Sequence, residues 1–108
     1  MRPDRAREIF YQRCSEADAA RAIGRLRVAP LRPLAAGLAG EIPSQLPRAF
    51  IECTEDRAIS LERQRFMAAR GRMDAVRSLE TDHSPFLSAP AALVARLLEL
   101  AAILEAVS

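Results

Sequence analysis

Asp56 and His83 are the residues of this sequence whose types and spacing point most directly to chemistry. Asp56 follows the apolar run "AFIEC", and His83, the only histidine in the chain, follows "AVRSL". The two residues are 27 positions apart, which leaves room for one helix and one strand between them. Residues just past the carboxyl ends of adjacent parallel strands meet on one rim of a sheet. We therefore predict that Asp56 orients the His83 ring and that His83 acts as a general base, as in an acyl-transfer triad.

Neighbouring residues leave alternatives to this pair open. Glu55 is the substitute for Asp56 as the acid. A second alternative is that the acids are only negative charges that stabilise the N-terminus of a nearby helix, which applies to Asp56, Glu55 and Asp82. In the corresponding alternative for His83, it is a loop histidine without a role. Ser84 is interpreted as a loop hydrogen-bonding residue rather than a nucleophile, because neighbours in sequence seldom aim at each other productively.

The elements that must position this pair follow from the apolar patterns and the capping residues. Ser15 and Ser60 are expected to cap helices, and Gly71 is expected to end one. The face formed by Leu93, Leu97, Leu100 and Leu104 is expected to be buried. We predict helices over 2–14, 15–27, 60–71 and 89–107, strands over 48–53 and 73–80, a connector over 28–47 with little regular structure, and a loop over 81–88.

From residue 48 onward the predicted order is strand, helix, strand, helix. This order indicates an α/β fold with two parallel strands joined by a right-handed crossover. Two parallel strands alone leave both sheet edges open, and parallel sheets are normally covered on both faces. The sequence therefore predicts a piece of a larger sheet.

Composition excludes several classes of function. The 108 residues fit one small domain, and the 16 basic residues, all arginine, are interleaved with 14 acidic ones. No basic cluster indicates nucleic-acid binding, and no C-x-x-C pair indicates a metal site. Cys14 and Cys53 are expected to be reduced thiols, with Cys53 behaving as a small hydrophobic residue. No apolar run resembles a signal peptide or a membrane span, so we expect a cytoplasmic protein without cofactor, metal, nucleic-acid or membrane partner.

The segment "CTEDRAISLERQRFMAARGRMDAVRSLETDHSPFLSAPAALVARLLELA" resembles the C-terminal end of α/β-hydrolases. It is most similar to the branch of plant methylesterases, hydroxynitrile lyases and their bacterial esterase relatives. In that branch a "C-T-E-D" turn carries the triad acid, which implies Asp56, and a later "D-H" before "S-x-P" carries the triad histidine, which implies His83. The resemblance implies cap-derived helices and a connector over 1–46, and a C-terminal βαβα unit of the hydrolase core over 47–108. Phe10 and Tyr11 in the cap helix face the substrate or anchor the cap, and the pattern favours neither.

The sequence also departs from this family. Hydroxynitrile lyases of the branch carry a lysine after the histidine, where this chain has Ser84, so the resemblance favours an esterase. No two of the four glycines bracket a serine as G-x-S-x-G requires, and the oxyanion-hole loop is missing. We expect a truncated reading frame, a decayed gene or a split protein. Its small-molecule ester substrate would require a missing N-terminal region, and the chain alone is expected to be inactive. The alternatives are a non-catalytic fragment that forms a homo-oligomer or binds a partner through its sheet edges, and a small helical adaptor.

Overall fold

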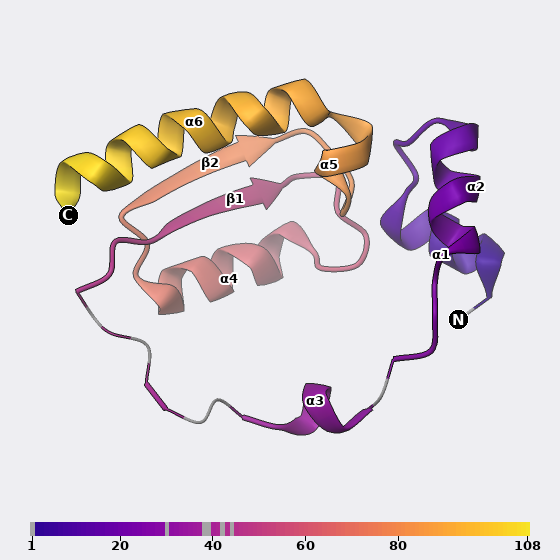
Figure 1. Ribbon diagram of the computed structural model, residues 1–108, viewed down its shortest axis with the longest axis horizontal. Helices are drawn as coiled ribbons and strands as arrows, with labels where there is room; N and C mark the ends of the chain where they lie inside the picture. The colour runs from indigo at the N-terminus through magenta and orange to yellow at the C-terminus, as the bar shows by residue number, and fades with distance from the viewer. Residues whose placement is uncertain (1, 30, 38–39, 42, 44) are drawn as a thin grey trace.

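A pair of parallel strands forms the centre of the computed structural model, which describes residues 2–29, 31–37, 40, 41, 43 and 45–108 (Figure 1). Strands β1 (Ala49–Cys53) and β2 (Ala75–Leu79) pair in register from Ala49 opposite Ala75 to Cys53 opposite Leu79. Helix α4 (Leu61–Gly71) connects them. The predicted α/β class and parallel pairing are confirmed.

Helices cover both faces of this sheet. Helix α6 (Pro90–Val107) packs on the face where the Arg77 guanidinium of β2 pairs with the Glu99 carboxylate. Helix α4 packs on the opposite face, where the Arg65 guanidinium pairs with the Glu52 carboxylate of β1 at 3.1 Å. Side chains alternate between the two faces along each strand, so both strands contribute to both layers.

The N-terminal part of the chain folds as a helical hairpin at the carboxyl end of the sheet (Figure 1). Helix α1 (Pro3–Phe10) and helix α2 (Glu16–Gly24) bury Ala6 and Ala19 between them. The predicted cap at Ser15 is confirmed, because its Oγ accepts a hydrogen bond from Asp18 N at 3.1 Å. Helix α1 ends earlier than predicted, because residues 11–14 turn toward the sheet instead of continuing the helix.

Two short helices correct the predicted irregular segments. Helix α3 (Leu31–Ala35) lies within the connector, and α5 (Pro85–Ser88) lies within the predicted loop over 81–88. Pro85 opens α5, where its missing N–H and fixed φ suit a first helical position. Residues 30, 38, 39, 42 and 44 of the connector lie outside the described residues.

The apolar core is small for a chain of this length. The Cα radius of gyration is 15.8 Å, whereas a compact chain of this length has about 13 Å. Leu100 is buried, but Leu93 and Leu104 are only half-buried and Leu97 is 51% exposed. The prediction that this leucine face is buried therefore holds at Leu100 and is wrong at Leu97, because a sheet of two strands is too narrow to cover the whole face.

Among the residues that the structure describes, one edge of β1 has no neighbouring strand. The carbonyl of Arg48 accepts from Asp74 N and the N–H of Thr54 donates to Leu79 O, so these positions face β2. By alternation, the N–H and C=O groups of Ala49, Ile51 and Cys53 point to the opposite edge.

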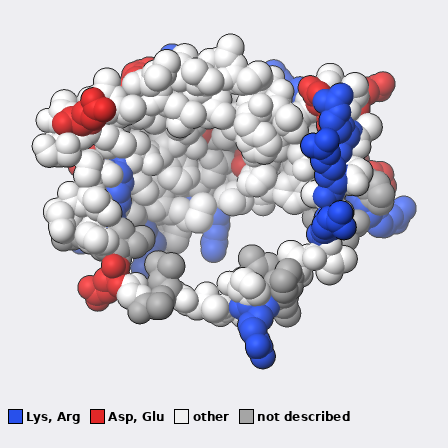
Figure 2. Space-filling model, viewed as in Figure 1, with Lys and Arg blue, Asp and Glu red and all other residues white. Residues whose placement is uncertain are grey.

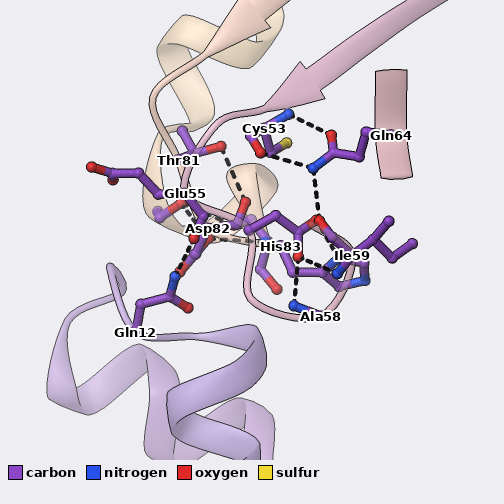
Figure 3. Close-up of polar contacts among 12 residues, drawn as sticks. Gln12, Cys53, Glu55, Ala58, Ile59, Gln64, Thr81, Asp82 and His83 are labelled. Atoms are coloured by element: carbon purple, nitrogen blue, oxygen red, sulfur yellow. Dashed lines mark hydrogen bonds and ion pairs between the residues drawn. The ribbon is translucent and has the colours of Figure 1, made fainter. Parts of the chain in front are cut away.

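The carboxamide of Gln64 closes that edge at its end. Its Oε1 accepts from Cys53 N at 2.8 Å, and its Nε2 donates to Cys53 O at 2.9 Å (Figure 3). Ala49 and Ile51 are therefore the positions of β1 at which a further strand would pair.

Candidate active site

Asp56 lies in the turn that follows β1, with its carboxylate held from two sides. Its Oδ1 accepts hydrogen bonds from the backbone N–H groups of Ala58 at 2.7 Å and Ile59 at 2.9 Å. The side chain is only 5% exposed. Short Asp side chains favour this kind of local turn, which fixes the direction of the second carboxylate oxygen.

That second oxygen, Asp56 Oδ2, lies 2.8 Å from His83 Nδ1. Because an ionised carboxylate only accepts hydrogen bonds, this contact places the ring proton on Nδ1. His83 Nε2 is then the nitrogen with a lone pair for a proton, and the side chain is 36% exposed. The Phe10 ring of α1 lies against the imidazole, with the ring centroids 5.4 Å apart. An imidazole oriented in this way has the geometry of a general base.

The backbone brings these two loops together. Thr54 N donates to Leu79 O at 2.8 Å, and Glu55 N donates to Thr81 O at 3.0 Å. These bonds continue the parallel ladder past the assigned ends of both strands. The residues that follow, Asp56 and His83, therefore leave the sheet from the same rim.

Asp82 is the most buried charged side chain at this rim, with 0% exposure. Its Oδ1 accepts from Ser84 N and Ser88 Oγ, each at 2.9 Å. Its Oδ2 accepts from Arg13 N at 3.0 Å and from Cys14 Sγ at 3.5 Å. The sequence indicates for Asp82 only a charge near a helix N-terminus, because its partners at positions 13 and 14 are distant in sequence.

Cys14 is a buried thiol beside this carboxylate. Burial, together with the negative charge of Asp82, raises the pKa of Cys14 to about 11. The thiol is therefore protonated at neutral pH and able to donate its S–H to Asp82. Burial also raises the pKa of Cys53. Both cysteines are free, as predicted, and both are buried.

Glu55, the alternative acid, points elsewhere. Its carboxylate pairs with the Arg13 guanidinium, and its carbonyl accepts from Gln12 Nε2 (Figure 3). The structure therefore brings Asp56, rather than Glu55, to His83. Ser84 is 2% exposed and uses its backbone N–H to bond Asp82.

Within the part of the chain that the structure describes, no group of three or more His, Cys, Asp or Glu side chains is arranged to hold a metal ion. None of the described helices has the length and apolar character that a bilayer-spanning segment requires.

Known proteins resemble this chain along almost its whole length. No protein-family model matches it. Methylesterase 17 from Arabidopsis thaliana is 30% identical over 107 residues, which cover 94% of this chain and 39% of that protein. The solved structure of the methylesterase protein MES16 from Arabidopsis matches with a TM-score of 0.86 and 28% identity, over 96% of this chain and 46% of that one. Polyneuridine aldehyde esterase matches with a TM-score of 0.81 and 26% identity, over 93% and 41% of the two chains.

The chain thus has the fold of the C-terminal part of an α/β-hydrolase and is similar to methylesterases. It spans less than half the length of the relatives that it matches. Two of these three relatives come from Arabidopsis, and the affiliation with bacterial esterases stays a prediction.

Proposed function

We propose that this chain supplies the acid and the base of a serine-hydrolase triad that cleaves small carboxylic esters. The observation that carries the proposal is the 2.8 Å contact between Asp56 Oδ2 and His83 Nδ1 on one rim of the sheet. The similarity to methylesterases and to an esterase supports ester cleavage as the reaction. The nucleophilic serine comes from polypeptide outside these 108 residues.

The pair performs two proton transfers in such a reaction. His83 Nε2 takes the proton of the serine hydroxyl as the serine oxygen bonds to the ester carbonyl carbon. The imidazolium then returns that proton to the leaving alcohol oxygen as the carbon–oxygen bond breaks. In the second half, His83 Nε2 takes a proton from water as the water oxygen bonds to the acyl carbon, and returns it to the serine oxygen as the acyl–serine bond breaks. Asp56 keeps the ring in the tautomer with its proton on Nδ1 and stabilises the imidazolium.

The chain alone lacks the group that His83 would activate. No G-x-S-x-G segment is present in the sequence. A missing oxyanion-hole donor lowers the rate by roughly 10²–10³-fold, and loss of the nucleophile removes covalent catalysis altogether. We therefore expect no ester turnover above the buffer rate from the isolated chain.

A complementation assay tests this proposal. The purified chain is assayed with p-nitrophenyl acetate, first alone and then mixed with the N-terminal portion of methylesterase 17 that precedes the matched region. Turnover is expected only in the mixture. It should disappear with His83→Ala and fall strongly with Asp56→Asn. Glu55→Gln, a neighbouring acid that pairs with Arg13 instead of His83, is the matched control and should keep full activity.

Three outcomes would contradict the proposal. Turnover by the isolated chain that His83→Ala abolishes would show that no outside nucleophile is needed. If the mixture hydrolyses the ester equally well with His83→Ala, the histidine takes no part in the reaction. A complex of the two polypeptides that forms on a sizing column but stays inactive would exclude a shared triad.

A second, non-catalytic role is favoured by the open edge of β1. Beside Ala49 and Ile51 lies an apolar groove of about 460 Å³, whose other walls come from α6: Leu97, Leu100, Ala101 and Leu104. The surface over α6 is largely uncharged in Figure 2, whereas arginines gather at the α1–α2 end. An unpaired strand edge beside an apolar groove is a template for another chain. In this alternative, a second copy of the chain pairs there.

Light scattering on the purified chain tests the second role. A dimer is expected, and Leu97→Glu should convert it to monomer, because the carboxylate would enter the groove without a partner. Glu105→Gln, an exposed change farther along α6, is the control and should leave the dimer intact. A folded monomer at all concentrations would contradict this role.

A further inference from the structure

The buried carboxylate of Asp82 joins two parts of the chain that meet at the proposed active site. Its Oδ2 accepts from Arg13 N and Cys14 Sγ, in the turn between α1 and α2. Its Oδ1 accepts from Ser84 N and Ser88 Oγ, on the C-terminal side of His83. Figure 3 shows Asp82 beside His83, between the strand ends and the helical hairpin. One side chain thus connects the hairpin to the loop that contains the histidine.

This connection affects the position of His83 through its backbone and through the ring that packs on it. Ser84, whose N–H bonds Asp82, is the next residue after His83, so the carboxylate fixes the backbone on both sides of the imidazole. The hairpin that Asp82 holds also supplies Phe10, whose ring packs against the imidazole at 5.4 Å. The four hydrogen bonds that the Asp82 carboxylate accepts from described residues come from Arg13, Cys14, Ser84 and Ser88, so its influence on the His83 ring is indirect.

The pattern of donors requires a carboxylate at this position. Each of the two oxygens accepts from a backbone N–H, Ser84 N on Oδ1 and Arg13 N on Oδ2. An asparagine has only one carbonyl oxygen, and its NH₂ group would face one of these N–H donors in either orientation. A buried carboxylate is unfavourable unless donors surround it, and here four neutral donors do so.

We propose that Asp82 is a positioning residue for His83. It locks the backbone of the His83 loop and holds the α1–α2 hairpin so that Phe10 packs against the imidazole. Through these contacts it keeps His83 Nδ1 directed at Asp56. This role deepens the proposed function, because it rests on His83 being the base of the triad.

Nuclear magnetic resonance of the only histidine tests the role of Asp82. In the chain labelled with ¹⁵N-histidine, the two ring nitrogens report the tautomer, and a nuclear Overhauser contact reports Phe10 against His83. Asp82→Asn is expected to shift both ring nitrogens away from the tautomer protonated at Nδ1 and to abolish the contact with Phe10. Glu80→Gln, an exposed acid two residues earlier with the same change of charge, should shift neither.

Ser88→Ala keeps the proposal testable if Asp82→Asn fails to fold. It removes one donor to Asp82 Oδ1 and leaves the carboxylate in place, so a smaller shift of the same ring nitrogens is expected. Circular dichroism checks that each variant retains its helices, so that a shift at His83 is not the result of unfolding.

Asp56→Asn separates this proposal from the proposed function. If Asp56→Asn leaves the His83 tautomer unchanged, the acid–base pair itself is wrong. If Asp56→Asn changes the tautomer but folded Asp82→Asn and Ser88→Ala leave both the ring shifts and the Phe10 contact unchanged, the pair stands and the positioning role of Asp82 is overturned.

Discussion

Asp56 Oδ2 and His83 Nδ1 lie 2.8 Å apart although the two residues are 27 positions apart in the sequence. The sheet makes this contact possible, because the ladder continues past the strands through the bond from Glu55 N to Thr81 O. The local turn at Asp56 then aims one carboxylate oxygen at the ring. The orientation of His83 thus depends on backbone hydrogen bonds on both loops.

Asp56 should contribute to stability separately from its contact with the histidine. Asp56→Ala removes the acceptor for Ala58 N and Ile59 N, and should lower the free energy of unfolding by about 1–3 kcal/mol. Asp56→Asn can keep its carbonyl oxygen on the same donors, and should lose less than about 1 kcal/mol. Urea unfolding of the two variants measures the difference. Equal losses would contradict the assigned roles of the two oxygens.

Glu52 should make the chain sensitive to acid. Hydrogen bonds from the Arg65 guanidinium and then from the Ser78 hydroxyl hold the pKa of Glu52 below its ordinary value of 4.5. A carboxyl group with a lowered folded-state pKa stabilises the fold fully above its unfolded pKa, and this stabilisation is lost as pH falls through the folded pKa. Stability should therefore decline below about pH 4.5, the ordinary value of this group, and less steeply in Glu52→Gln.

Unfolding followed at a series of pH values measures this decline. Glu62→Gln, a change at an exposed position of α4, is the control. Its stability should decline with falling pH as steeply as that of the wild type. An identical slope in Glu52→Gln and the wild type would rule out Glu52 as a source of the acid sensitivity.

Gln64 should protect the open edge of β1 at Cys53. Gln64→Leu leaves the N–H and C=O of Cys53 without their hydrogen-bond partners, and should lower the free energy of unfolding by about 1–3 kcal/mol. Arg63→Leu, one residue earlier on an exposed position, should change it by less than about 0.5 kcal/mol. Denaturant unfolding compares the two. A loss no greater in Gln64→Leu than in the control would contradict the capping role.

Arg72 should be a site where glycine stabilises the chain. Arg72 follows α4 with φ of 53° and ψ of 63°, the left-handed conformation. This conformation is unfavourable for a residue with a Cβ, and glycine adopts it readily. Arg72→Gly should raise the free energy of unfolding by about 0.5–1 kcal/mol, whereas Arg70→Gly, within the helix, should lower it by about 1 kcal/mol. A thermal shift of the same sign in both variants would contradict this assignment.

Much of the fold follows from local patterns in the sequence. The strand at 49–53 is a short, mostly apolar run, the strand at 75–79 mixes apolar with polar residues, and Ser15 and Ser60 cap helices through their own side chains. Such signals depend on neighbours within a few positions. The meeting of Asp56 and His83 follows from the order of these elements, because parallel strands end on one rim.

The rest depends on contacts that no local pattern encodes. The leucine repeat of α6 predicts a buried face, but the width of the sheet leaves Leu97 exposed. Asp82 resembles any loop acid in the sequence, and its buried role depends on a turn 68 residues earlier that supplies Cys14. Likewise, Glu55 and Asp56 are equivalent by spacing, and only the direction of the turn assigns Asp56 to the histidine.

The tautomer of His83 tests the acid–base pair most directly. In the chain labelled with ¹⁵N-histidine, the neutral ring should carry its proton on Nδ1 and leave Nε2 unprotonated. In Asp56→Asn the amide NH₂ would face Nδ1, and the proton should move to Nε2. A wild-type ring protonated on Nε2, or a tautomer that Asp56→Asn leaves unchanged, would contradict the pairing on which the proposed function rests.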